Sequence, residues 1–225
     1  MKPSPEKYVE AASWLFGEVE PDEGYSEAAV SEVEQRLGFR LPTLLRTVYL
    51  RTGRRDDFHQ AQNRLRELNE LTVENRVLVF LDENQGSAFW GVPVEALAEE
   101  DPPVLLGSDD FSRWEEFDHL NQFLHARLFW VRMELAPQVL KYNAPSKLLA
   151  AIEQRWPPIS VPPGRSDVGR SEETAARWYG GDDVLALVLG KAPSMTIQIA
   201  SFDDEPLRKL GKELCLQWDE ADWNE

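Results

Sequence analysis

The sequence predicts an α+β fold, with a mainly antiparallel sheet of about five to six strands and helices packed against it. The first observation is the order of the expected elements, which are helices, strands, helices, strands and a final helix, without the regular strand-helix alternation of a parallel sheet. The second is the composition, because 42% hydrophobic and 10% aromatic residues, including 8 Trp, supply enough apolar surface for a core. We expect residues 1–225 to form a single domain with an irregular, proline-rich connection at 156–173.

Two helices are predicted early in the chain. Ser26 is a candidate N-cap for the first helix, and Gly38 is a candidate C-terminal cap. Pro42 suits the first turn of the second helix, which Gly53 ends. The pair has the outline of a helix-turn-helix hairpin, but its acidic first helix argues against DNA binding.

A β-hairpin is predicted from "RVLVFL", residues 76–81, and "AFWGV", residues 88–92. The intervening "ENQG" is expected to be a turn, because Asn84 and Gly86 tolerate positive φ and the neighbouring carboxylate and amide side chains can bond to backbone groups. Trp90 would pack beneath this turn. The alternative is that the turn contacts a partner directly.

A third helix is predicted over residues 114–130, after "DPPV" at 101–104 interrupts regular structure. Apolar residues at helical spacing support it: Phe117, Leu120, Phe123, Leu124 and Leu128. Three strands at 174–180, 183–190 and 195–202 and a closing helix at 204–214 complete the expected fold.

The formal net charge of −16 favours a basic partner and argues against nucleic acid or an anionic membrane. Residues 95–119 are the most acidic stretch, with nine carboxylates against Arg113 alone. No apolar run reaches the roughly 18 residues that span a bilayer, and the N-terminus is broken by Pro and Glu where a signal peptide is apolar. We therefore expect a cytoplasmic protein without membrane contact.

The residues do not predict an enzyme, a cofactor or a metal site. His59, His119 and His125 are not spaced to share a helical face, and no phosphate-loop, dinucleotide or hydrolase signature occurs. Cys215 lies between two leucines, so we expect a buried, unreactive thiol. Carboxylates in 95–119 could serve acid-base chemistry, although acidic runs are more typical of solvated surfaces.

Two sequence blocks resemble the SUKH superfamily, which includes the fungal Smi/Knr cell-wall-assembly regulators and many bacterial immunity proteins. The first block is "EVEQRLGFRLPTLLRTVYLRTG"; the second is "LVFLDENQGSAFWGV", followed by "DPPV", a Trp and "LNQFL". The resemblance covers residues 26–130, while the C-terminal strands are compatible with it but carry no motif. It implies an α+β fold and a non-enzymatic role in binding and neutralising a polymorphic toxin, often a nuclease or deaminase. The alternative is a regulatory or scaffold protein of the Smi/Knr type that binds an endogenous partner.

A partner-binding surface is predicted where acids surround an aromatic side chain, because aromatic anchors dominate most interfaces. Its predicted members are Asp109, Asp110, Trp114, Glu115 and Glu116. Phe111 and Phe117 are further candidate anchors, and Phe117 fits the core better. The alternative is an acidic segment that only aids solubility.

Overall fold

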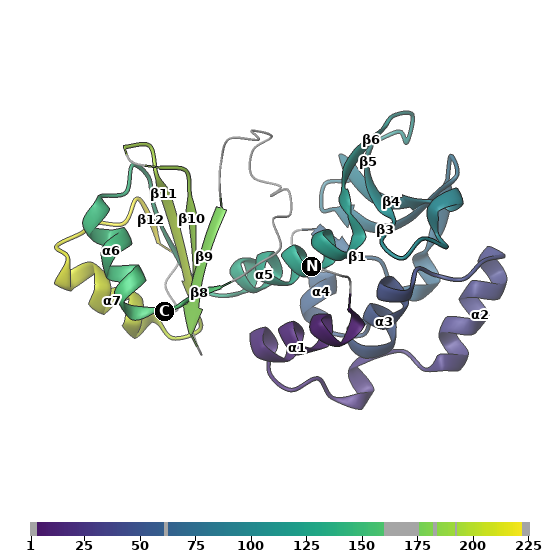
Figure 1. Cartoon of the computed structure of the whole chain (residues 1–225), viewed down its shortest axis with the longest axis horizontal. Coiled ribbons are helices and arrows are strands. Elements are labelled where there is room, and N and C mark those ends of the chain that lie inside the picture. The colour runs from purple at the N-terminus through teal and green to yellow at the C-terminus, as the bar shows by residue number, and fades with distance from the viewer. Residues whose placement is uncertain (1–3, 61–62, 160–175, 182–183, 192, 222–225) are drawn as a thin grey trace. The chain divides into compact units, whose positions relative to one another are not determined.

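The computed structural model describes residues 4–60, 63–159, 176–181, 184–191 and 193–221. The chain divides into two compact units, Met1–Val131 and Arg132–Glu225, each with its own antiparallel sheet (Figure 1). The α+β class is therefore confirmed. We expected a single domain over 1–225 with one sheet, and the structure differs because each unit builds a separate sheet and packs its own helices against it.

The helices of unit 1 begin and end close to the signals in the sequence. Ser26 Oγ accepts a hydrogen bond from Ala29 N at 3.2 Å, and Gly38, with φ of 83°, donates its N–H to Glu34 O. The helix that starts after Pro42 ends at Gly53. The bounds are α1 (Pro5–Phe16), η1 (Pro21–Glu23), α2 (Glu27–Leu37), α3 (Thr43–Thr52), α4 (Asp56–Gln60), η2 (Leu68–Glu70), η3 (Val94–Ala96) and α5 (Leu120–Leu135), which runs into unit 2.

The sheet of unit 1 has six antiparallel strands. Its order is β1-β3-β4-β5-β6, and β2 also pairs with β3. The strands are β1 (Asn63–Leu65), β2 (Thr72–Glu74), β3 (Val77–Glu83), β4 (Ala88–Pro93), β5 (Pro103–Ser108) and β6 (Trp114–His119). The predicted hairpin of "RVLVFL" and "AFWGV" is confirmed as β3 and β4.

The helix predicted over 114–130 is wrong in its first part. Trp114–His119 is β6, and α5 starts only at Leu120. β6 pairs antiparallel with β5, from Gly107 opposite Trp114 to Pro103 opposite His119. The aromatic and acidic residues of this short segment are compatible with a strand of alternating faces as well as with a helical turn. Pairing with β5 therefore determines that the segment is a strand.

One face of this sheet packs on α5 through edge-to-face aromatic contacts. The ring centroid of Phe123 lies 5.8 Å from Phe80 and 5.9 Å from Phe117, and Trp90 lies 6.3 Å from Phe117. Phe80 and Trp90 are buried. Phe117 is partly buried and packs against Trp90 and Phe123 of the core, and it lies on a strand rather than on the predicted helix.

The "ENQG" stretch forms the turn between β3 and β4. Gly86 has φ of 70°, whereas Asn84 is not among the residues with positive φ. The Glu83 carboxylate accepts hydrogen bonds from Gln85 N, Ser87 N and Ser87 Oγ. Desolvation by itself would raise the pKa of the Glu83 carboxyl group. The hydrogen bonds from Ser87 and Gln85 outweigh this effect, so the pKa of Glu83 is lowered. The polar side chain of Glu83 therefore serves the turn.

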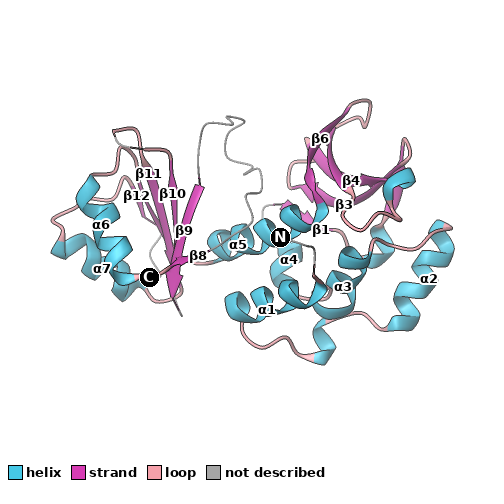
Figure 2. Cartoon of the chain, viewed as in Figure 1, coloured by secondary structure: helices cyan, strands magenta, loops and turns pink. Residues whose placement is uncertain are grey.

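Unit 2 packs two helices on one face of a second sheet (Figure 2). The sheet order is β12-β7-β11-β10-β9-β8, and every pair is antiparallel. Leu148 and Ile152 of one helix and Leu207 and Leu210 of the other meet apolar side chains of the strands. The bounds are β7 (Gln138–Lys141), α6 (Ser146–Arg155), β8 (Pro158–Ile159), β9 (Ala176–Gly181), β10 (Val184–Leu189), β11 (Thr196–Ser201), α7 (Asp204–Glu213) and β12 (Glu220–Ala221).

The three predicted C-terminal strands and the closing helix are confirmed as β9, β10, β11 and α7. Of the predicted irregular connection at 156–173, residues 160–173 lie outside the described residues. The part that is described is not wholly irregular, because Pro158–Ile159 pairs with β9. Across the described ranges, no helix is both long and apolar enough to span a bilayer.

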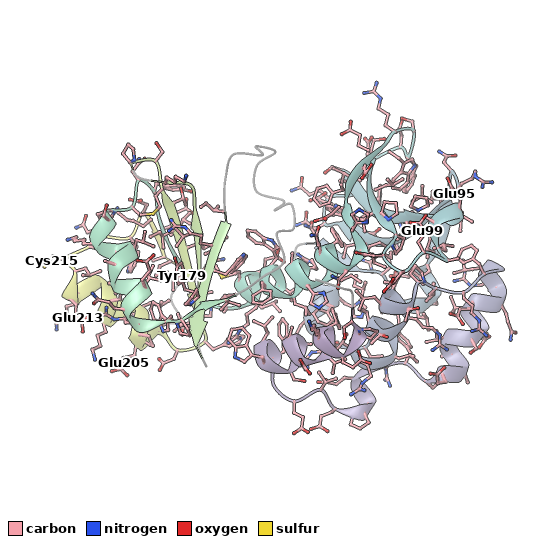
Figure 3. The ribbon with its side chains drawn as sticks, viewed as in Figure 1. Glu95, Glu99, Tyr179, Glu205, Glu213 and Cys215 are labelled. Carbon is pink, nitrogen blue, oxygen red and sulfur yellow. The ribbon has the colours of Figure 1, made fainter. Side chains whose placement is uncertain are left out.

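The predicted burial of the Cys215 thiol is wrong. The thiol is exposed rather than buried, and it lies just beyond α7 (Figure 3). Cys215 N donates to Lys212 O and Leu216 N donates to Gly211 O, which is the Schellman pattern that closes a helix. This motif requires a left-handed residue after the helix, and Cys215 takes that position with φ of 48°. The two flanking leucines turn inward while the cysteine turns outward.

Candidate functional site

All five predicted partner-binding residues lie in one structural element, the hairpin of β5 and β6. Asp109 and Asp110 are in the turn, and Trp114, Glu115 and Glu116 are on β6. The four carboxylates are exposed, and Trp114 is partly exposed. The structure therefore brings these residues together, although it does so on a hairpin and not on the expected helix.

The turn of this hairpin is built by its own polar groups. Asp110 Oδ1 accepts hydrogen bonds from Ser108 Oγ at 2.8 Å and from Ser112 N at 3.0 Å. Hydrogen bonds from Ser112 and Ser108 lower the pKa of Asp110 to about 2. Its charge is thus retained at any physiological pH, and one of its oxygens is already committed to the fold.

Three aromatic rings form a row beside the acids, and we call Phe89, Phe111 and Trp114 the aromatic row. The ring centroid of Phe111 lies 4.3 Å from that of Phe89 and 6.1 Å from that of Trp114, and both pairs are stacked. Each ring is partly exposed. Phe111 has φ of 57°, and Asn75 Nδ2 donates to its carbonyl oxygen at 2.8 Å, which fixes the end of the row.

The sheet register explains why these rings meet. Phe89 lies opposite Gly107, which in turn lies opposite Trp114. Side chains alternate along a strand, so Trp114 and Glu116 share the face of the aromatic row while Glu115 points to the other face. The sequence did not identify Phe89 as part of this surface. The sequence did predict that Phe89 lies on a strand, and pairing of that strand with β5 is what brings Phe89 to this surface.

The aromatic row borders a group of paired charges. Arg66 lies over Phe89, with its guanidinium carbon 5.8 Å from the ring centroid. Arg66 Nε donates to Asp82 Oδ1 at 2.6 Å, and the other Asp82 oxygen is 3.1 Å from Arg64. Both arginine side chains are thus held by carboxylates.

The acidic stretch 95–119 divides into structural and exposed members. Asp101 Oδ1 accepts from Asn121 N at the start of α5, and Asp118 Oδ1 accepts from His119 N. Glu95 and Glu99, marked in Figure 3, are exposed on the segment between β4 and β5. The stretch is therefore neither a single acidic loop nor a convergent carboxylate cluster.

The three histidines contact backbone carbonyls instead of one another. His59 has both ring nitrogens within 2.9 Å of carbonyl oxygens, of Leu65 and Gly53, while His119 contacts Asp101 O and His125 contacts Asn121 O. Within the ranges that the structure describes, no group of three or more His, Cys, Asp or Glu side chains could hold a metal ion.

A concave surface lies between α2 and η2. This groove has a volume of about 570 Å³ and an apolar floor that includes Val33 and Leu68. Its rim carries Glu32, Arg36 and Glu67. Arg36 donates to the carbonyl oxygens of Asn69 and Leu71, so this arginine ties the helix to the neighbouring turn.

Comparisons with protein-family models, with curated proteins and with solved structures found no match to this chain.

Proposed function

We propose that this protein is a non-enzymatic binding module, and that it acts as an immunity protein that neutralises a cognate toxin by covering the toxin's active surface. The observation that carries the proposal is the hairpin of β5 and β6, whose turn and outer strand carry four exposed acids together with Phe111 and Trp114 of the partly exposed aromatic row. Interfaces commonly pair aromatic anchors with a charged rim. The resemblance of residues 26–130 to the SUKH superfamily supports the same class of protein.

The charge of the chain indicates the kind of partner. A net charge of −16 repels nucleic acid and attracts a basic protein such as a nuclease or deaminase. Acids on the hairpin would steer a basic cleft toward the aromatic row and raise the association rate. Once docked, the hairpin would exclude the substrate by occupancy, so neutralisation needs no chemistry.

The first test identifies the partner. The immobilised full chain is expected to retain a basic protein from an extract of its native host, and co-expression is expected to relieve that protein's toxicity. A partner that is an endogenous regulator without toxic activity would instead favour the Smi/Knr-type scaffold role.

The second test uses the purified partner and a charge variant of the hairpin. Asp109→Asn, Asp110→Asn, Glu115→Gln and Glu116→Gln together remove four charges while keeping side-chain shape. At low salt the association rate is expected to fall by about tenfold or more, and this loss is expected to shrink as salt is added.

The matched control removes four exposed acids elsewhere in unit 1: Glu10, Glu18, Asp22 and Glu99. It makes the same change in net charge, so its association rate is expected to fall far less than that of the hairpin variant. Equal rates in the two variants would remove the hairpin from the proposal.

A further inference from the structure

The groove between α2 and η2 has the size of a binding pocket. Its volume of about 570 Å³ lies within the range of roughly 300–1,000 Å³ that ligand pockets occupy. Val33 and Leu68 on its floor are buried, and Ala29 and Tyr25 line it as partly exposed residues. The groove therefore offers apolar surface that an occupant would remove from water.

The walls of this groove are held in place by hydrogen bonds. Arg36 on α2 donates from Nη2 to Leu71 O at 3.1 Å and to Asn69 O at 3.4 Å, which joins the helix to η2 and to the residue that follows it. Tyr25 N donates to Tyr49 O at 2.8 Å, which holds the segment before α2 on α3. The groove thus exists before an occupant arrives, and this preorganisation lowers the entropic cost of binding.

Two carboxylates stand at the rim of the groove, one from each flank. Glu32 is on α2 and Glu67 directly precedes η2, and both residues are exposed. Arg36 is spaced i,i+4 from Glu32 and could pair with it, but its Nη2 atom donates to backbone carbonyl oxygens instead. The lining residues carry two negative charges against this one positive charge, so the groove favours a cation.

Tyr25 adds an aromatic ring to the negative surroundings. Burial raises the pKa of the Tyr25 hydroxyl, and the charges of Glu67 and Glu70 add to this effect. The backbone of Leu68 and the charge of Arg54 oppose the rise without reversing it. The negative potential that disfavours a tyrosinate also attracts a cation toward the ring.

We propose that the α2–η2 groove binds an arginine side chain of a partner protein, flanked by apolar residues of the same segment. Arginine fits these surroundings better than lysine, because a planar guanidinium stacks on an aromatic ring and donates in pairs to carboxylates. The guanidinium lies against Tyr25 between Glu32 and Glu67. The apolar neighbours of the arginine cover Val33 and Leu68 on the floor.

The charge of the chain argues against a second copy as the occupant, because two chains that each carry −16 repel each other. The inference goes beyond the proposed function, because it requires neither the hairpin of β5 and β6 nor a toxic partner.

The test uses three peptides that differ at one position, on the full-length protein. Each has blocked ends and the order glycine, leucine, X, leucine, glycine, where X is arginine, lysine or citrulline, the neutral isostere of arginine. Binding is followed by NMR titration at about 0.15 M salt. The arginine peptide is expected to shift the amide signals of Ala29, Glu32, Val33 and Leu68. The citrulline peptide is expected to bind about tenfold more weakly, and the lysine peptide about threefold more weakly.

Charge variants test the two carboxylates. Glu32→Gln together with Glu67→Gln is expected to weaken the arginine peptide by about tenfold and to leave the citrulline peptide unaffected. The matched control, Glu10→Gln with Glu18→Gln, removes the same charge from exposed positions elsewhere in unit 1 and is expected to leave both affinities unchanged.

A variant that fills the groove separates this site from general attraction to an acidic protein. Ala29→Phe keeps every charge, adds bulk within the groove and is expected to abolish the shifts of Val33 and Leu68. Thermal unfolding checks that this variant folds, and the charge variants decide the question if it does not.

Three results would overturn the proposal. The first is an arginine peptide that gives no shifts, or that binds the Glu32 and Glu67 variant as well as the unmodified chain. The second is equal binding of the arginine and lysine peptides, which would show that the groove accepts any cation. The third is a concentration-dependent dimer that Ala29→Phe abolishes, which would make a second copy of this chain the occupant.

Discussion

The indole ring of Trp114 lies over the backbone of Gly107, its neighbour across the β5–β6 ladder. A Cβ atom at Gly107 would fall 2.6 Å from Cζ3 and 2.7 Å from Cη2 of the indole, closer than real carbon contacts. Phe111 stacks on the same ring. The aromatic row therefore depends on the absence of a side chain at position 107.

Replacing Gly107 with alanine is expected to displace the Trp114 ring and to lower the free energy of unfolding by about 1–3 kcal/mol, since the new methyl group overpacks the face. Urea unfolding followed by tryptophan fluorescence measures the loss. Gly181→Ala is the control, because a Cβ there meets Trp156 Cδ1 at 3.4 Å. A similar loss at both positions would contradict the packing of Trp114 on Gly107.

Glu34 is expected to stabilise the connection between α2 and α3. Its carboxylate accepts from Leu41 N at 3.0 Å and lies 3.3 Å from Arg46 Nε, with its side chain only 10% exposed. Glu34→Ala leaves a buried N–H without its acceptor and is expected to cost about 1–3 kcal/mol in denaturant unfolding. Glu34→Gln keeps an acceptor and is expected to cost less.

Glu27 provides the control for this prediction, because it pairs with the same arginine at the surface. The Glu27 side chain is 71% exposed, so Glu27→Ala is expected to cost about 0.5 kcal/mol or less. If Glu27→Ala destabilises the protein as much as Glu34→Ala, the stabilising contact is the Arg46 ion pair and not the bond to Leu41.

Local signals in the sequence predicted the parts of the fold that local chemistry determines. Ser26 and Gly38 mark the ends of α2, and Gly86 marks the turn between β3 and β4. The segment 114–119 needed long-range information, because its strand form depends on pairing with β5. The same holds for Phe89, which joins the aromatic row through sheet register.

The candidate surface was predicted only in part for a similar reason. The acids were assigned to one surface only because they are close together in the sequence. The sequence does not show that Asp110 closes the turn or that Glu115 and Glu116 point to opposite faces, because both facts follow from the hairpin. The division into two units was also hidden, since neither sheet carries a signal that separates it from the other.

Cys215 is expected to be a weak point of unit 2. Its left-handed conformation disfavours residues with a side chain, whereas glycine is the usual residue at this position of a Schellman motif. Cys215→Gly is therefore expected to raise the free energy of unfolding by about 1 kcal/mol relative to Cys215→Ala. Both variants lack the thiol, so a difference in thermal or urea unfolding reports the backbone alone. Equal stability would contradict this explanation.

The exposure of Cys215 also predicts how fast its thiol reacts in the folded protein. In the native protein the thiol is expected to react with a small disulfide reagent at a rate close to that of an unfolded control, because it is exposed. The absorbance of the released thiolate measures this rate. A native rate slower by about a hundredfold or more would indicate that the thiol is covered.

His125 is expected to make the protein less stable in mild acid. The imidazole is buried, Nδ1 donates to Asn121 O at 2.7 Å, and Nε2 has no hydrogen-bond partner among the described residues. Burial lowers the pKa of His125, and the charge of Lys7 adds to this effect, while the bond to Asn121 and the charge of Asp101 oppose it.

The direction of the pH dependence follows from this lowered pKa. Below about pH 6.5 the unfolded chain binds a proton at His125 that the folded protein does not, so the free energy of unfolding falls as the pH decreases. The slope from this one group is at most about 1.4 kcal/mol per pH unit, and it ends at the folded-state pKa. Urea unfolding between pH 5 and about pH 8 measures it.

His125→Gln keeps an amide donor for Asn121 O but cannot become charged, so its stability is expected to fall less steeply below about pH 6.5 than that of the unmodified chain. His119→Gln, which removes an exposed histidine, is expected to leave the slope unchanged. If the His125→Gln and unmodified curves are parallel, the imidazole accepts its proton in the folded state, and the unpartnered Nε2 must then reach solvent or an acceptor without unfolding.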